Sequence, residues 1–365
     1  MLAEMHSVTK RNKALFRSWS VCGYVPTIAI VNSSLLQSYR TVKVIALRKG
    51  WGLMSKHIDR QTTLAQQVTL EGIGVHSGKP ATLTLIPADA NTGIVFQRTD
   101  DEANSEVPAL WNKVTATALC TVLSDPFKDG VSTVEHLMAA LAGLGVDNVI
   151  AELDGPEMPI MDGSSVAFVE AIKQAGLKRL DRGRRYIRVK KAVRVDNGSA
   201  WCELVPNDRT SYDITIDFDT PLIGRQRFAA DMTPDVFCNE LCRARTFGYV
   251  SDVEKLWKMG FALGSSLENS VAISEDKVLN PEGTRWPDEF ARHKALDAVG
   301  DLALAGLPIL GLYRSFKGGH KMNHAILEKL FEDSSAYEIV EAPVYRAHSQ
   351  ATPGLAAAAF GPDVS

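Results

Sequence analysis

His293 and Asp297 are four residues apart in a stretch whose composition is compatible with a helix. On a helix this spacing places an imidazole and a carboxylate on one face, with about 5–6 Å between their Cβ atoms, close enough to bind one metal ion together. A catalytic zinc site usually needs a third ligand, an open position for water and a nearby base. The adjacent pair Glu135-His136 is the best candidate for that base and that ligand.

Two imidazoles and one carboxylate suit zinc, or iron or cobalt, better than magnesium. A second interpretation stays open, because a polar stripe on an amphipathic helix is usually solvent-exposed surface. His293, Asp297 and Asp301 would lie within about 80° of arc, with Leu296 and Val299 on the opposite side.

Ser132-Thr133-Val134-Glu135 also fits a purely structural role, the capping box. In that motif Ser132 caps a helix and Glu135, three residues later, reaches back to the Ser132 amide. The two roles are partly compatible, because the positive end of the helix dipole lowers a carboxylate pKa and disfavours a charged imidazole. We therefore expect Glu135 to be ionised and His136 to be neutral.

A third segment, Lys317-Gly318-Gly319-His320, places His320 where a loop enters a helix. Glycine allows the backbone to approach a ligand closely. A carboxylate such as Asp301 nearby would keep the imidazole charged at neutral pH, which suits a general acid. The alternative is an ordinary surface histidine.

The helices and strands that position these residues belong to a chain of 365 residues, of which 45% are hydrophobic. A chain of this length and composition can bury substantial cores and form two domains. Residues 1–53 carry a net charge of +7, which leaves −10 on residues 54–365. An acidic body has no general affinity for nucleic-acid phosphates, so we expect no nucleic-acid partner.

The basic extension, residues 1–53, has three interpretations. Translation could begin at Met54, the extension could be a cleaved targeting peptide, or it could be a disordered or membrane-surface-seeking arm. Its apolar stretch is short and interrupted by Pro26, so we expect no stable membrane insertion. Residues 347–365, with four consecutive alanines and two prolines, predict a disordered tail.

The five cysteines are odd in number and scattered, which does not indicate a disulfide framework. A reducing cytoplasm fits this usage best, and we expect a cytoplasmic protein. Cys238 and Cys242 could share a helix face, but we interpret them as ordinary buried or half-buried thiols.

The apolar periodicity predicts an α+β fold, with a first domain at residues 54–182 and a second at 183–346. Alternation over Ala81–Ile86 and Tyr212–Phe218 predicts half-buried strands. The basic segment Lys178–Arg185 is the expected linker between the domains. Helices are expected at about 132–144, 233–244, 250–259, 288–305 and 321–332.

Six short motifs follow one another in a fixed order. They are Gly74–Gly78, Ser132–Leu137, Asp154–Ser164, Ala244–Gly248, Arg292–Asp301 and Gly319-His320. Together they closely resemble the UDP-3-O-acyl-N-acetylglucosamine deacetylases of lipid A synthesis, over roughly Gln61–Glu341. Six ordered motifs at these separations would hardly arise by chance.

The resemblance implies two domains, each a two-layer sandwich of sheet and helix, with the active site at the domain interface. It implies Zn²⁺ as the cofactor, with Fe²⁺ possible in its place. The residues implied are His136, His293 and Asp297 as metal ligands, Glu135 as the base that activates water, His320 as the acid that protonates the leaving amine, Asp301 as the group that keeps His320 charged, and Thr246 as the hydroxyl that stabilises the oxyanion.

The resemblance also implies where the substrate binds. Lys294 matches a residue that lines the substrate site. Phe247 and the insert at about 248–273 match an apolar passage for the acyl chain. Asp217, Phe218 and Lys317 match positions near the uridine diphosphate.

The sequence thus predicts an enzyme, a zinc-dependent deacetylase that releases acetate from UDP-3-O-(3-hydroxyacyl)-N-acetylglucosamine, and we expect a monomer. Two alternatives stay open. One is a zinc deacylase for a different acylated sugar. The other is a non-catalytic protein that binds nucleotide sugars and whose histidines are structural.

Overall fold

The computed structural model describes residues 59–100, 105–125 and 128–342. The hypotheses about residues 1–53 and 347–365 concern segments outside this range. None of the helices in the described part of the chain has the length and apolar character needed to cross a bilayer.

The first half of the chain builds a five-stranded sheet in the order β2-β3-β9-β4-β5. Its residues alternate between buried and partly exposed, which is typical of a sheet with one face on a core. The strands are β2 (Val68–Ile73), β3 (Pro80–Pro87), β4 (Ile94–Arg98), β5 (Glu106–Pro108) and β9 (Val149–Leu153).

The second half builds a seven-stranded sheet around β19 (Ile309–Phe316). This strand pairs antiparallel with β13 and parallel with β11 and β14. The other strands are β11 (Arg185–Val189), β12 (Val193–Asn197), β13 (Ala200–Val205), β14 (Thr210–Asp217), β15 (Arg225–Asp231) and β20 (Tyr337–Glu341).

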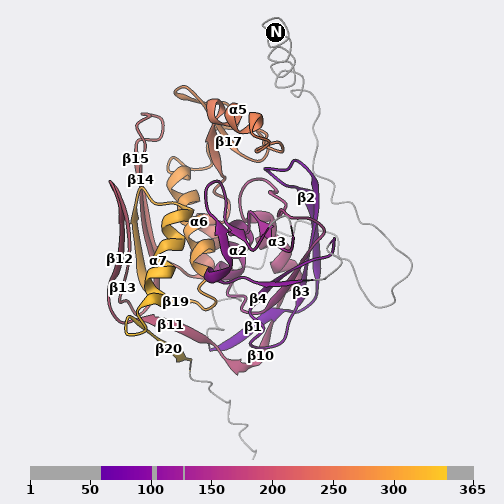
Figure 1. Ribbon diagram of the computed structural model, residues 1–365, viewed down its shortest axis with the longest axis vertical. Helices are drawn as coiled ribbons and strands as arrows, with labels where there is room; N and C mark the ends of the chain where they lie inside the picture. The colour runs from indigo at the N-terminus through magenta and orange to yellow at the C-terminus, as the bar shows by residue number, and fades with distance from the viewer. Residues whose placement is uncertain (1–58, 101–104, 126–127, 343–365) are drawn as a thin grey trace, which may run out of the picture.

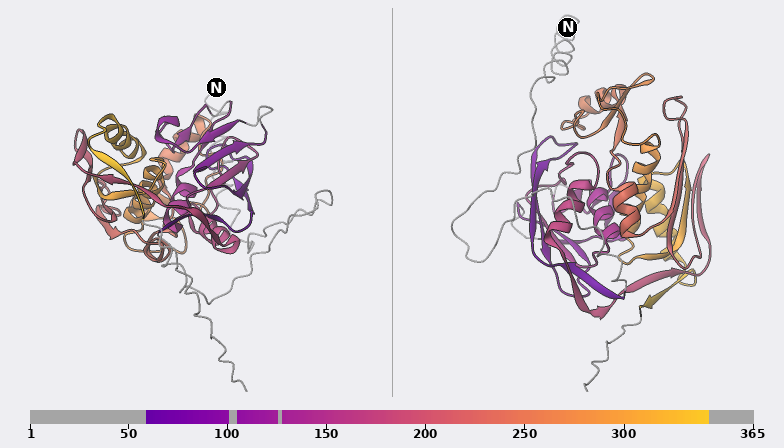
Figure 2. Two further views of the ribbon diagram at one scale, coloured as in Figure 1. Left: turned by 90° about the horizontal axis from the view of Figure 1, so that it is seen from below. Right: turned by 180° about the vertical axis from the view of Figure 1, so that it is seen from behind.

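The helices lie between these two sheets (Figures 1 and 2). Each sheet therefore has a helical layer on its inner face, and the predicted α+β fold is confirmed. The helices are α2 (Glu135–Leu144), α3 (Val166–Ala175), α4 (Pro234–Val236) followed by the π-helix η2 (Phe237–Leu241), α6 (Glu289–Ala303) and α7 (His320–Glu332).

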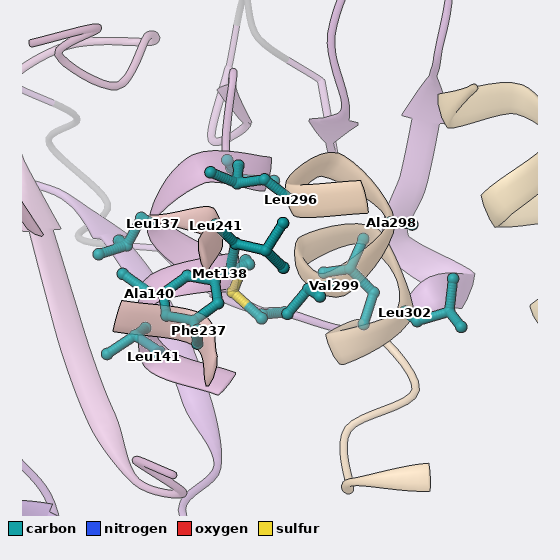
Figure 3. Packing of buried hydrophobic residues seen from close by; sticks show 14 of the residues in the cluster. Leu137, Met138, Ala140, Leu141, Phe237, Leu241, Leu296, Ala298, Val299 and Leu302 are labelled. Atoms are coloured by element: carbon teal, nitrogen blue, oxygen red, sulfur yellow. The ribbon is translucent and has the colours of Figure 1, made fainter. Parts of the chain in front are cut away.

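Helices α2 and α6 pack directly against each other in the centre of the molecule. Met138 on α2 and Val299 on α6 meet in the apolar cluster that Figure 3 shows, together with Phe237 of η2. Gly300 permits this close approach, because a Cβ atom there would lie 2.0 Å from the carbonyl oxygen of Glu135. The packing of these two helices therefore sets the distance between the predicted site residues that they carry.

A smaller unit projects beyond the central layers at the top of Figure 1. Its three strands and one helix span the segment expected as an insert at about 248–273, and the helix begins and ends close to the predicted 250–259. The elements are β16 (Phe247–Tyr249), α5 (Val250–Lys258), β17 (Val271–Ser274) and β18 (Lys277–Val278).

The segment expected as a linker is instead mostly a strand. β10 (Leu177–Gly183) pairs antiparallel with β1 (Arg60–Leu64), which is the first described strand of the chain. Its exposed basic side chains resemble a linker in composition, but backbone pairing with β1 gives it regular structure. The predicted domain boundary itself stays a prediction.

A second small sheet precedes α2, in the order β6-β7-β8. A short 3₁₀ helix, η1 (Trp111–Lys113), leads into it. The strands are β6 (Val114–Ala116), β7 (Val122–Leu123) and β8 (Val131–Ser132). This sheet brings the chain to the start of α2, where the first candidate site residues lie.

Candidate functional site

Three buried side chains converge where α2 packs against α6. His136 lies in the first turn of α2, while His293 and Asp297 lie one turn apart on α6. The Nε2 atoms of His136 and His293 are 3.6 and 3.3 Å from Asp297 Oδ1, and one ligand atom of each residue lies within 4.8 Å of the others. The structure thus brings together the three residues predicted as metal ligands.

The polar atoms of this cluster fit a metal ion. Asp297 Oδ1 is buried and has no hydrogen-bond partner among the described residues. His293 Nδ1 lies 3.1 Å from the carbonyl oxygen of Ala244, so a neutral ring carries its proton on Nδ1 and leaves Nε2 free as a ligand. Burial lowers the pKa of His293 to about 3, which keeps this imidazole neutral.

The interpretation of the polar face of α6 as solvent-exposed surface is wrong. His293, Asp297 and Asp301 are each no more than 2% exposed. Most of the helix is buried, because it lies between α2 on one side and the second sheet on the other (Figure 1). Periodicity could not show this, since it identifies the polar face but not what covers it.

Glu135 begins α2, but the capping box is not formed. Both the amide and the hydroxyl of Ser132 donate to the carbonyl oxygen of Pro156, so Glu135 has no contact with the Ser132 amide. Glu135 Oε2 instead accepts a hydrogen bond from the Thr121 amide, at 3.1 Å. Thr133 has φ +61°, a conformation uncommon for a side chain of this shape, and it turns the chain immediately before the helix.

The pKa of Glu135 also differs from the expectation. We expected the helix dipole to lower it, but burial of this carboxyl raises it. Glu135 is 3% exposed, and loss of water around a carboxylate disfavours the charged form more than a nearby dipole favours it. A raised pKa is nevertheless suited to a general base, because it brings the group closer to neutral pH.

His320 is the first residue of α7 and faces the same cluster. Its Nδ1 donates to Asp301 Oδ2 at 2.8 Å, and its Nε2 lies 3.9 Å from Glu135 Oε1. Burial opposes a charge on this ring, but Asp301 and Asp297 outweigh it and raise the pKa of His320 to about 9. The imidazole is therefore protonated at neutral pH and is no ordinary surface histidine.

Comparison with known proteins shows the family of this chain. The profile of the UDP-3-O-acyl N-acetylglycosamine deacetylase family matches residues 61–332. The chain belongs to this family. Curated relatives from Brucella ovis and Brucella canis, both named UDP-3-O-acyl-N-acetylglucosamine deacetylase, are each 50% identical to it over 283 residues, which cover 77% of this chain and 99% of each relative. The predicted family resemblance is confirmed.

Three of the substrate-contacting residues expected of a deacetylase of this family lie beside the triad. Lys294 Nζ donates to Asp297 Oδ2 at 2.9 Å and lies 5.7 Å from the centre of the Phe247 ring. The Phe247 ring packs edge-to-face on the rings of His293, at 6.2 Å, and Phe218, at 5.8 Å. A cation and an aromatic wall therefore adjoin the predicted metal ligands.

The other two residues expected to contact the substrate, Asp217 and Lys317, form an ion pair with each other. Lys317 Nζ lies 3.4 Å from Asp217 Oδ2, and both side chains are about one-third exposed. Asp217 ends β14, next to Phe218, and Lys317 follows β19 three residues before His320. The pair thus connects the aromatic wall to the start of α7.

Thr246, the predicted oxyanion donor, is held through its backbone. Its amide donates to the carbonyl oxygen of Gly163 at 2.7 Å, and its own carbonyl accepts from Val271 of the insert. The preceding residue, Arg245, forms a buried ion pair with Glu289 in the first turn of α6, with Nε and Oε1 3.0 Å apart. Thr246 is therefore fixed relative to the helix that carries His293.

The structure adds residues that sequence reasoning missed. Asn323 Nδ2 donates to Asp301 Oδ2 at 2.8 Å, and Thr121 Oγ1 donates to Asp301 Oδ1 at 2.6 Å. Asn323 follows His320 by three residues on one helix, a spacing that places both on one face and could have identified it. Thr121 carries no such signal, because nothing near it in sequence belongs to the site.

His76 had no partner visible in sequence, and the structure gives it several. The amides of His76 and Ser77 donate to the buried carboxylate of Glu157, at 2.7 and 2.8 Å. The His76 carbonyl accepts from the Leu263 amide, and its ring packs edge-to-face on Phe261, 6.0 Å away. The first motif therefore supports the insert rather than the metal cluster.

Proposed function

We propose that this protein catalyses the zinc-dependent hydrolysis of the acetamide of UDP-3-O-(3-hydroxyacyl)-N-acetylglucosamine, giving UDP-3-O-(3-hydroxyacyl)-glucosamine and acetate, an early committed step of lipid A synthesis. The observation that carries the proposal is the convergence of His136, His293 and Asp297, with Glu135 and His320 facing the same cluster. The names of the Brucella relatives support the choice of substrate.

In this proposal His136, His293 and Asp297 hold the metal ion. Two features support that role: no described residue donates a hydrogen bond to Asp297 Oδ1, and the Ala244 contact at Nδ1 of His293 leaves Nε2 unprotonated as a ligand atom. A bound zinc ion supplies Lewis acidity, which makes water nucleophilic at neutral pH and polarises a carbonyl group. Fe²⁺ suits the same donor set and is proposed as a possible replacement.

The protein side chains handle the protons. Glu135 takes a proton from the attacking water, whose oxygen bonds to the acetamide carbon. His320 delivers its proton to the amine nitrogen as the carbon–nitrogen bond breaks, since an amide nitrogen leaves poorly unless it is protonated. Asp301 keeps His320 charged, and the hydroxyl of Thr246 donates to the oxygen on which negative charge develops.

The substrate-binding roles rest on the residues beside the triad. Lys294 carries a positive charge and Phe247 an apolar face, both within reach of the reacting centre. We assign Asp217, Phe218 and Lys317 to the nucleotide end of the substrate. The insert supplies apolar side chains for the acyl chain, among them Phe261 and Leu263, which are 45% and 54% exposed.

We place this reaction in the cytoplasm. The four cysteines among the described residues are buried and unpaired, as a reducing compartment allows. We propose a monomer that has no nucleic-acid partner and no stable membrane insertion. Light scattering of the purified protein gives its molar mass in solution and so tests whether it is a monomer.

The decisive experiment measures acetate release from the acylated substrate by purified protein. We expect chelation to abolish the activity and Zn²⁺ to restore it, with one metal ion per chain. Replacing the UDP group or shortening the acyl chain should lower kcat/KM, and equal rates with another acylated sugar would favour a different deacylase. Substrate binding without acetate release would indicate a non-catalytic binding protein.

A further inference from the structure

Thr121 contacts both halves of the candidate proton-transfer machinery. It lies immediately before β7 and is 1% exposed. Its amide donates to Glu135 Oε2 at 3.1 Å, and its hydroxyl donates to Asp301 Oδ1 at 2.6 Å. One residue therefore holds the proposed base through its backbone and the partner of the proposed acid through its side chain.

The backbone of Thr121 is itself fixed. Its carbonyl oxygen accepts hydrogen bonds from the amides of Thr133 and Val134, at 3.0 and 3.4 Å. These two residues lead directly into Glu135, and Thr133 has the left-handed backbone conformation described above. The position of Thr121 is thus set by the same turn that places Glu135.

The hydroxyl of Thr121 completes the hydrogen bonding of Asp301. Asp301 Oδ2 accepts from His320 Nδ1 and Asn323 Nδ2, both at 2.8 Å, and Oδ1 accepts from Thr121. Donors on both oxygens prevent rotation of the carboxylate, because rotation would break a charge-assisted hydrogen bond inside a buried site. The carboxylate plane in turn fixes the direction of the His320 ring.

We propose that Thr121 is a positioning residue for hydrolysis. Its hydroxyl orients Asp301, and Asp301 in turn orients His320. Its amide holds the Glu135 carboxylate, so one residue sets the position of the acid relative to the base. This inference rests on the proposed function, because it assigns Glu135 and His320 as base and acid. The hydrogen bonds of Thr121 go to Glu135, Asp301, Thr133 and Val134, none of which is a proposed metal ligand.

Two substitutions separate positioning from packing. Thr121→Val keeps the branched shape and the amide but removes the hydroxyl, whereas Thr121→Ser keeps the hydroxyl and removes a methyl group. We expect Thr121→Val to lower kcat by roughly 10- to 100-fold, as loss of a second-layer partner commonly does, with KM and metal content unchanged. Thr121→Ser should keep most of the turnover.

A matched control is Thr210→Val. Thr210 Oγ1 donates to the carbonyl oxygen of Ile309 at 2.7 Å, a hydrogen bond of similar length at the start of β14 in the second sheet. We expect this variant to keep wild-type kcat. Urea unfolding of all variants shows whether kcat follows stability or the presence of the Thr121 hydroxyl. If Thr121→Val does not fold, Thr121→Ala removes the same hydroxyl without placing a methyl group against the Asp301 carboxylate.

A second readout does not need activity. In protein with ¹⁵N-labelled histidine, the Nδ1 proton of His320 reports its hydrogen bond to Asp301. We expect its resonance to shift in Thr121→Val and to stay in place in Thr121→Ser. An unchanged resonance and unchanged kcat in Thr121→Val would overturn the proposal, as would equal impairment of the two variants. If the wild-type protein releases no acetate, the proposed function fails, and the resonance alone tests the positioning.

Discussion

His320 Nε2 and Glu135 Oε1 face each other at 3.9 Å, from the first residues of α7 and α2. Burial raises the pKa of Glu135, while Asp301 and Asp297 overcome the effect of burial and raise the pKa of His320 to about 9. The structure thus pairs a carboxylate whose proton affinity is increased with an imidazole that is charged at neutral pH. Such a pair can take a proton on one side of a substrate and deliver one on the other.

Glu135→Gln tests the base. The amide keeps the shape of the side chain and an oxygen to accept from Thr121, but it cannot take up a proton. We expect the variant to bind the metal ion normally and to lose on the order of 10²–10⁴-fold in kcat, which is typical for removal of a general base. Metal analysis and acetate release measure the two effects. Glu328→Gln, at an exposed site on α7, is the control, and equal activity in the two variants would remove Glu135 from the mechanism.

Asp297→Ala tests the metal site. Zinc that binds only the folded state stabilises it by about 2.7 kcal/mol when the free concentration is 100 times the Kd. We expect the unfolding midpoint of the wild-type protein to rise with zinc and that of Asp297→Ala to stay constant. The control is Asp252→Asn on the exposed side of α5. A zinc-dependent rise of the same size in Asp297→Ala would place the metal elsewhere.

The raised pKa of His320 predicts how stability depends on pH in the metal-free protein. Because the pKa is about 9 in the folded state and about 6.5 in an unfolded chain, protonation of His320 stabilises the folded state fully below pH 6.5. This contribution is lost as the pH rises through 9, and it amounts to something on the order of 3 kcal/mol.

Urea unfolding of the wild type and of His320→Asn between pH 6 and pH 10 measures this stabilisation by the protonated His320. The difference in unfolding free energy between the two proteins should shrink as the pH rises. A difference that does not change with pH would show that the Asp301 contact does not favour the charged imidazole.

Gly300→Ala tests the spacing of α2 and α6. The added Cβ would lie 2.0 Å from the Glu135 carbonyl oxygen, so the helices must separate and carry His293 and Asp297 away from His136. We expect a loss of stability of roughly 1–3 kcal/mol, as overpacking usually costs, together with weaker metal binding. Gly155→Ala is the control, because nothing lies within 4 Å of its added Cβ. Urea unfolding of both variants measures the loss of stability, and zinc titration measures the weakening of metal binding.

Much of the local structure could be predicted from sequence. The strand at Ala81–Ile86 and the helix at about 288–305 follow from apolar spacing, and the structure has β3 and α6 there. The segment Lys178–Arg185 could not be identified in this way. Its strand depends on pairing with β1, more than a hundred residues earlier in the chain, and such pairing leaves no local pattern.

The order of the motifs identified the family and proposed every residue of the triad, but not the environment of those residues. The capping box at Ser132 was wrong because the Pro156 carbonyl competes for both the amide and the hydroxyl of that serine. The lowered pKa expected for Glu135 was wrong because desolvation depends on the neighbours that cover a side chain.

By itself, then, the sequence determined which residue types stand at which spacing, and hence the fold class, the family and the candidate ligands. Only the tertiary structure decided that α2 and α6 meet at Gly300, that Asp301 is buried between His320 and Thr121, and that the resulting pKa values of Glu135 and His320 both rise. The physical reason is that spacing along one element fixes the direction of a side chain, whereas its partners and its exposure to water come from elements distant in the chain.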